Sequence, residues 1–224
     1  MRDPKRLKVL FIGNSHTYFN FMPQMLVLMV KAAKHGFSLE VEQCTGKGVS
    51  LEWHWNNPTT RKTIATKNWD YIVLQERSAG PLEESASFDY HAQLLDGEIK
   101  NQGAQTILYM TWANRSRFET QSIIAGAYEQ VARKIGAILA PVGSAWKRVF
   151  QLQPKTRLHH DDDRHANPVG SYLAACVFYV IMCGHSPVSL PEKLLIADKV
   201  TVDLDEAFAL FLHKIAFEIV SHPT

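Results

Sequence analysis

The fold of this chain is decided by one stretch near its start, Lys8-Val9-Leu10-Phe11-Ile12-Gly13-Asn14-Ser15-His16-Thr17-Tyr18. Its apolar run from Val9 to Ile12 is too short for a helix face and is typical of a strand buried on both sides in a parallel sheet. Gly13 ends the strand, because glycine reaches backbone angles that other residues avoid. Ser15 then lies just beyond the carboxyl end of the strand, where open α/β sheets bind ligands. Its hydroxyl either faces a crevice or simply caps the next helix.

Further along the chain, strand and helix patterns alternate. Strands are expected over residues 39–41, 71–74, 106–110 and 137–140, and the main helices over 22–35, 88–101, 119–135, 168–184 and 204–220. This alternation favours right-handed βαβ crossovers and a mostly parallel sheet with helices on both faces. We therefore predict an α/β fold in one domain over residues 1–224, with five strands in the flavodoxin-like order 2-1-3-4-5.

Composition narrows the classes of partner. A net charge of +2 indicates neither a nucleic-acid nor a membrane partner, and no apolar run reaches the roughly 18 residues that span a bilayer. The first strand begins near Lys8, which leaves no room for a signal peptide. Cys44, Cys176 and Cys183 show no metal spacing, and their odd number favours a reducing cytoplasm. We expect a cytoplasmic protein without a cofactor, and the sequence does not indicate its oligomeric state.

Polar residues follow the predicted strand ends and should meet at one edge of the sheet: Ser15, Gly48, Gln75, Asn114 and Ser144. The polar segment 159–165 precedes a long apolar helix and can reach the same edge. Within it, Asp162 can accept a hydrogen bond from Nδ1 of His165, three residues later, and leave Nε2 free as a base. A serine needs such a base to become a nucleophile. The pattern predicts a triad of Ser15, Asp162 and His165.

These motifs resemble the SGNH (GDSL-like) hydrolase superfamily, which has a serine just after its first strand and a late Asp-x-x-His. The resemblance rests on Gly13-Asn14-Ser15-His16-Thr17 and on Asp162-Asp163-Arg164-His165, and it covers residues 8–187. Asn14 stands where many members carry Asp. The runs 48–55, 74–76 and 168–175 are similar to a bacterial branch of the superfamily whose substrates are poorly defined.

The resemblance implies a three-layer α/β/α sandwich and a serine hydrolase that cleaves an ester, often an acyl group on a sugar or lipid. It implies that Ser15 is the nucleophile, His165 the base and Asp162 the residue that orients the base. Asp163 is the alternative partner of His165 if the register of the pair is shifted by one residue.

The resemblance also implies an oxyanion hole formed by the N–H groups of Ser15 and Gly48. Gly46 is close enough in sequence to exchange roles with Gly48. The superfamily's asparagine after the third strand has no clear counterpart here. Gln75 lies closest and is our expected third donor, and Asn114, at the next strand end, is the alternative.

The cluster of His159, His160, Asp161, Asp163 and His165 has side chains that bind zinc or iron in other proteins. Ligands bunched on one loop cannot easily surround an ion without distant partners. We therefore predict no metal site, and a solvated polar loop for His159, His160 and Asp161.

Tryptophans follow several predicted strand ends. Core packing is the usual role of tryptophan, but we hypothesise that at least one stacks on a substrate ring such as a sugar, and the candidates are Trp53, Trp112 and Trp146. Arg77 could contact an acidic substrate group, although a surface position is more usual for arginine.

The sequence thus favours a serine esterase of small-molecule acyl esters, in particular a deacetylase of a carbohydrate. The alternative is a binding module for a small, sugar-like ligand that has kept the fold and lost the chemistry, because fold does not imply function. An α/β-hydrolase would need a Gly-x-Ser-x-Gly pentapeptide, which the chain lacks.

Overall fold

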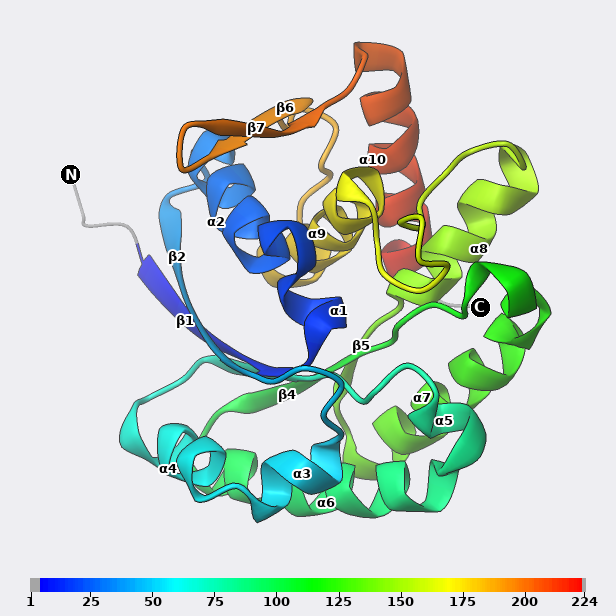
Figure 1. Ribbon diagram of the computed structural model, residues 1–224. Coiled ribbons are helices and arrows are strands. Elements are labelled where there is room, and N and C mark those ends of the chain that lie inside the picture. The colour runs from blue at the N-terminus through cyan, green and yellow to red at the C-terminus, as the bar shows by residue number, and fades with distance from the viewer. Residues whose placement is uncertain (1–4, 223–224) are drawn as a thin grey trace.

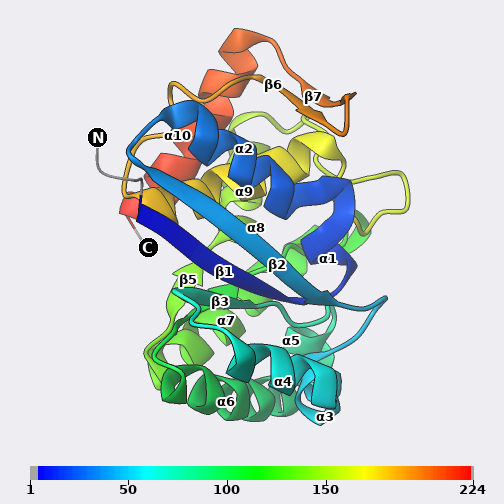
Figure 2. The ribbon, with the colours of Figure 1, turned by 90° about the vertical axis from the view of Figure 1, so that its left-hand side faces the viewer.

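A five-stranded sheet runs through the centre of the computed structural model, which describes residues 5–222 (Figures 1 and 2). All neighbouring strands pair in parallel, in the order β2-β1-β3-β4-β5, which confirms the predicted topology. The strands are β1 (Lys5–Gly13), β2 (Phe37–Thr45), β3 (Tyr71–Leu74), β4 (Gln105–Tyr109) and β5 (Ile138–Ala140).

Helices cover both faces of this sheet and complete the three layers (Figure 1). One face carries α1 (Ser15–Tyr18), α2 (Met22–Ala33), α8 (Val142–Leu152), α9 (Pro168–Cys183) and α10 (Glu206–Ser221). The other face carries α3 (Leu51–Asn56), α4 (Pro58–Thr66), α5 (Gly80–Glu83), α6 (Ser85–Asn101) and α7 (Gln121–Ile135). Two 3₁₀ turns, η1 (Phe19–Phe21) and η2 (Arg115–Thr120), precede α2 and α7.

Strand β1 explains why there are two hydrophobic cores. Successive side chains of a strand point to opposite faces. Val9 and Phe11 accordingly pack into the core beneath α2 and α9, whereas Leu10 and Ile12 pack into the core beneath α6 and α7. All four side chains are fully buried. The uninterrupted apolar run of this stretch is what a strand covered on both sides requires.

Helix α9 is buried along nearly its whole length, which accounts for a sequence that is apolar on every side. The Asn167 side chain caps its start by accepting a hydrogen bond from the Gly170 N–H at 2.9 Å. The helix begins at Pro168 and ends at Gly184, whose φ of +67° is in the left-handed region. Because His165 stands three residues ahead of Pro168, this rigid helix fixes the position of the predicted base.

Several elements were missing from the sequence prediction, including the short helices α3 and α5 and two larger elements. The first is α8, which begins immediately after β5, so Ser144 lies inside a helix and the expectation that it marks a strand end is wrong. The second is a hairpin of β6 (Lys193–Ile196) and β7 (Lys199–Asp203). Its turn residues Ala197 and Asp198 both have positive φ, a geometry that sequences usually signal with Asn-Gly.

Within residues 5–222, no helix combines the length and the apolar character needed to cross a membrane.

Candidate active site

The turn after β1 places Ser15 at the first position of α1. The Asn14 side chain caps this helix, since its Oδ1 accepts from the His16 N–H at 3.0 Å, while its Nδ2 donates to the Val49 carbonyl at 2.9 Å. Gly13 is needed here because of space, not because of an unusual φ. A Cβ on Gly13 would lie 2.5 Å from Gln75 Oε1 and 2.7 Å from Thr17 Oγ1.

The structure brings Ser15, His165 and Asp162 together in one chain of hydrogen bonds. His165 Nε2 lies 2.8 Å from Ser15 Oγ, although the two residues are 150 positions apart. On the other side of the ring, His165 Nδ1 lies 2.5 Å from Asp162 Oδ2. This arrangement leaves Nε2 able to accept the serine proton.

Asp162 is held in the charged form that such a role requires. Partial burial opposes its ionisation, but hydrogen bonds from the His165 side chain and from the N–H groups of His165 and Arg164 outweigh it and lower the pKa of the carboxyl. The two N–H groups lie 2.9 and 3.1 Å from Asp162 Oδ1. The carboxylate therefore fixes both the ring of His165 and the loop that carries it.

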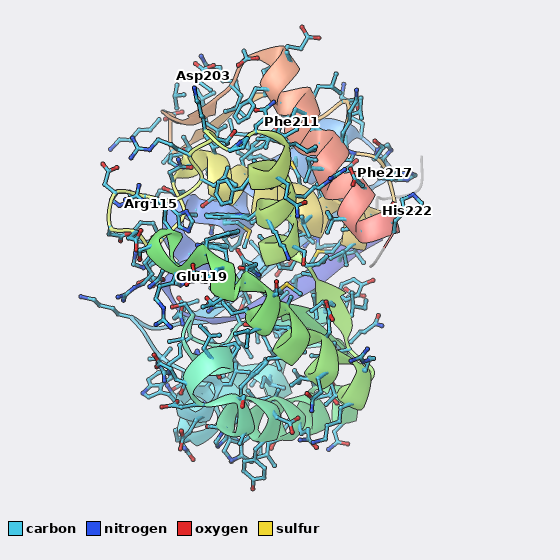
Figure 3. All side chains as sticks on the ribbon, turned by 90° about the vertical axis from the view of Figure 1, so that its right-hand side faces the viewer. Arg115, Glu119, Asp203, Phe211, Phe217 and His222 are labelled. Atoms are coloured by element: carbon cyan, nitrogen blue, oxygen red, sulfur yellow. The ribbon has the colours of Figure 1, made fainter. Side chains whose placement is uncertain are left out.

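Asp163, the alternative partner, faces away from His165. It accepts hydrogen bonds from the Ser116 N–H and hydroxyl, and it forms an ion pair with Arg115 at 3.2 Å. Figure 3 shows Arg115 near the start of the segment that leads into α7. Asp163 thus connects residues 159–165, which we call the histidine loop, to η2.

A cleft of about 430 Å³ opens in front of Ser15 and His165. Gly48 and Asn114 also line it, so it contains four of the predicted site residues. The complete lining is Asn14, Ser15, His16, Tyr18, Phe19, Lys47, Gly48, Arg77, Ser78, Ala79, Glu83, Asn114, Arg164 and His165.

Two residues at the cleft, Ser15 and Gly48, carry the backbone N–H groups expected to form the oxyanion hole. The Ser15 N–H is the first amide of α1 and has no partner within the helix. Gly48 lines the cleft with a φ of +66°, a conformation that favours glycine. Gly46 is the weaker candidate, because its N–H already donates to the Gly13 carbonyl at 3.3 Å.

Gln75, the expected third donor, does not face the cleft. It is fully buried, and its Oε1 accepts from the Asn14 N–H at 2.8 Å and the Thr17 hydroxyl at 2.9 Å. Its Nε2 donates to the Glu76 carbonyl. Its Oε1 therefore braces the turn at Ser15, and its Nε2 is used by the neighbouring Glu76 carbonyl. Asn114, which lines the cleft without capping η2 through its side chain, is left as the available amide.

The tryptophan hypothesis is wrong for Trp112 and Trp146, because both are buried and their rings stack on each other at 4.1 Å. The Trp112 Nε1 donates to the Arg164 carbonyl at 2.9 Å, and this hydrogen bond helps to hold the histidine loop in place. Trp53 is exposed on α3 and does not line the cleft. The aromatic lining comes from Tyr18 and Phe19 instead.

The expectation of a solvated loop is also wrong at His159. This side chain is buried, which lowers its pKa, and its Nε2 lies 2.9 Å from the Ala113 carbonyl. In the part of the chain that the structure describes, no three His, Cys, Asp or Glu side chains are grouped to hold a metal ion.

Sequence reasoning missed Asn20, which joins the segments that carry Ser15 and His165. Its Nδ2 lies 2.9 Å from both the Ala166 carbonyl and Ser171 Oγ. Its φ of +52° is in the left-handed region, which asparagine tolerates better than most residues. Just before it, the Phe19 ring stacks on the His165 ring at 4.3 Å. Neither contact has a sequence signal, because the partners are about 150 residues apart.

Glu76 is a second residue that the sequence did not single out. Its carboxylate is buried and accepts hydrogen bonds from the Leu51 N–H at 3.1 Å and the Arg77 N–H at 2.7 Å. Burial raises its pKa from the ordinary 4.5 to about 7, although these two hydrogen bonds oppose the shift. Glu76 thus joins the start of α3, at Leu51, to the cleft wall at Arg77.

Comparison with family models and with curated proteins finds no match. Solved structures do match. A candidate SGNH hydrolase from Slackia heliotrinireducens is 28% identical, with a TM-score of 0.67 over 80% of this chain and 100% of that chain. A DUF4886 family protein from Bacteroides uniformis is 19% identical, with a TM-score of 0.82 over 98% and 96% of the two chains. An acetyl xylan esterase is 16% identical, with a TM-score of 0.61 over 75% and 96%.

A parallel sheet in the order β2-β1-β3-β4-β5 with helices on both faces defines the three-layer α/β/α class of fold, and here a serine directly follows the strand β1. Together with the Slackia match, these features place the chain in the SGNH (GDSL-like) hydrolase superfamily.

Replacement of Asn20 should slow ester hydrolysis more than it destabilises the fold. Asn20→Gly keeps the left-handed backbone and removes both hydrogen bonds, so we expect kcat to fall about tenfold, because small displacements of reacting groups are costly. Asn20→Ala should show the same loss of kcat and a lower Tm from added backbone strain. Steady-state kinetics and thermal melts check this. Unchanged kcat in both variants would remove the positioning role.

Glu76 should make stability depend on pH. Its pKa is raised in the folded state, so the folded protein binds more protons than the unfolded chain between pH 4.5 and 7, and stability falls as pH rises through that window. Relative to Glu76→Gln, the wild type should lose up to about 3 kcal/mol of unfolding free energy. Denaturant titrations at pH 4.5 and 7.5 test this, with Glu52→Gln on exposed α3 as the control. Parallel pH profiles for wild type and Glu76→Gln would contradict it.

Proposed function

We propose that this protein is a serine esterase that hydrolyses small acyl esters, with Ser15, His165 and Asp162 as its catalytic triad. The observation that carries the proposal is the 2.8 Å contact between Ser15 Oγ and His165 Nε2. Hydroxyl, imidazole and carboxylate follow one another at hydrogen-bond distance, which is the geometry by which such triads are recognised.

In the first step, Ser15 Oγ attacks the ester carbonyl while His165 Nε2 takes the serine proton. The negative charge on the carbonyl oxygen is stabilised by the N–H groups of Ser15 and Gly48 and by the amide of Asn114. His165 then gives its proton to the leaving alcohol as the C–O bond breaks. Water, deprotonated by His165, attacks the acyl-enzyme and releases the acid and free Ser15.

The lining of the cleft favours a short acyl group. Its aromatic and aliphatic contributions are confined to Tyr18, Phe19 and Ala79, and most other lining side chains are polar or charged. A long acyl chain needs a deeper apolar channel to leave water. An acetyl group fits, and a polar alcohol such as a carbohydrate suits the remaining surface.

A second candidate is a binding module without catalytic activity. It is favoured by one observation, the burial of Gln75, which leaves the third oxyanion donor to a residue on a different strand end. A fluorophosphonate probe separates the two candidates, because it labels only a serine that is activated as a nucleophile. A wild-type protein that reacts neither with this probe nor with any acyl ester would be the binding module.

The triad predicts a graded loss of activity. Ser15→Ala should abolish labelling, and Ser15→Ala and His165→Ala should each lower kcat about a millionfold, whereas Asp162→Ala should lower it about ten-thousandfold. Asp161→Asn is the control, because Asp161 is exposed and, among residues 5–222, forms an ion pair with Arg157 alone, at 2.7 Å. Rates on aryl acetates and acetylated sugars measure the effect. Labelling that persists in the Ser15→Ala variant would refute the assignment of Ser15 as the nucleophile.

The two amides should respond differently. Asn114→Ala is expected to lower kcat by about a hundredfold or more at nearly constant Tm, because it removes a charge-stabilising donor. Gln75→Ala should mainly lower Tm, because it leaves the buried Asn14 N–H without its hydrogen-bond acceptor. Kinetics and melting curves on the same two variants decide the matter. A large loss of kcat in Gln75→Ala, with little loss in Asn114→Ala, would instead indicate Gln75 as the donor.

A further inference from the structure

The charges around the cleft are unequal. Lys47, Arg77 and Arg164 line it, against a single carboxylate, Glu83. The guanidinium of Arg77 is already balanced, because it forms ion pairs with Glu83 at 3.4 Å and Glu84 at 2.9 Å. In residues 5–222, no carboxylate lies within ion-pair distance of Lys47 or Arg164. The cleft therefore keeps two positive charges that the protein itself does not neutralise.

Both Lys47 and Arg164 line the cleft and are sequence neighbours of proposed reacting groups. Arg164 directly precedes His165, and its backbone is held on both sides, since its N–H donates to Asp162 Oδ1 at 3.1 Å and its carbonyl accepts from Trp112 Nε1 at 2.9 Å. Lys47 directly precedes Gly48. One cation thus belongs to the segment of the base and the other to the segment of the proposed oxyanion donor.

A third basic group at the cleft does not add to this charge. His16 is buried beside His165, with ring centroids 5.4 Å apart. Burial, together with the nearby charges of His165 and Arg164, lowers its pKa to about 3. His16 is therefore neutral near pH 7, and the positive field of the cleft comes from Lys47 and Arg164.

We propose that the substrate carries a negatively charged group, a carboxylate or a phosphate, on the alcohol half of its ester, and that Arg164 and Lys47 bind it. This inference rests on the proposed function. The leaving oxygen must lie at His165 Nε2 to receive its proton, so the alcohol half lies in the part of the cleft formed by the loop that carries both His165 and Arg164. Charge complementarity of this kind speeds encounter and selects among partners, and salt weakens it.

The test uses three acetate esters built on the same phenyl ring: 4-acetoxybenzoate, 4-acetoxyphenyl phosphate and neutral 4-acetoxybenzamide. For each ester, kcat/KM of Lys47→Gln and Arg164→Gln is divided by the wild-type value, which cancels differences between the leaving groups. We expect losses of about tenfold on the anionic esters and less than twofold on the neutral one. The anion with the larger loss identifies carboxylate or phosphate as the group recognised.

Two controls separate local recognition from a general effect of charge. Lys62→Gln removes the same charge from exposed α4, outside the cleft, and should change no ratio. Raising the ionic strength should lower wild-type kcat/KM for the anionic esters and leave the neutral ester nearly unaffected.

Equal losses on charged and neutral esters, or the same losses in Lys62→Gln, would overturn the inference while leaving the esterase function intact. A wild-type protein that hydrolyses none of the three esters would overturn the proposed function, and the inference with it.

Discussion

The contact between the Ser15 hydroxyl and the His165 ring depends on how the central sheet packs against the helix α9. One partner stands at the end of β1, the other just ahead of α9, and 150 residues of chain separate them. Both of these elements are buried, because residues 9–12 of β1 and most residues of α9 have no access to water. Closely packed interiors resist small shifts. The 2.8 Å separation is thus maintained by the packing of the whole fold and does not depend on the two side chains alone.

Around this contact, a set of polar side chains fixes the backbone. Gln75 binds the N–H of Asn14, Asn20 reaches Ala166, and Trp112 holds the Arg164 carbonyl. None of these groups faces an incoming ester carbonyl. They act through the residues on either side of the reacting atoms, which is how a site is kept in working geometry.

Patterns local in sequence predicted well, and those that depend on long-range packing did not. The apolar run from Val9 to Ile12 predicted the buried strand β1, and the alternation of strands and helices predicted the sheet order. The spacing of Asp162 and His165 anticipated their hydrogen bond. Position relative to a strand end does not reveal where a side chain points. Gln75 and Trp112 both follow strands, yet both turn inward, because the turn at Ser15 and the histidine loop each need a buried partner.

The active site combines a buried interior, which fixes the reacting groups, with exposed residues at the rim of the cleft, and this division affects how its substrate preference can change. The side chains that give the cleft its charge, Lys47 and Arg164, project from loops and are exposed. Surface substitutions of that kind usually change stability by less than about 0.5 kcal/mol. On the role proposed for Lys47 and Arg164, ester preference can change by exchange of these two rim residues alone, while the buried interior that maintains the fold stays the same.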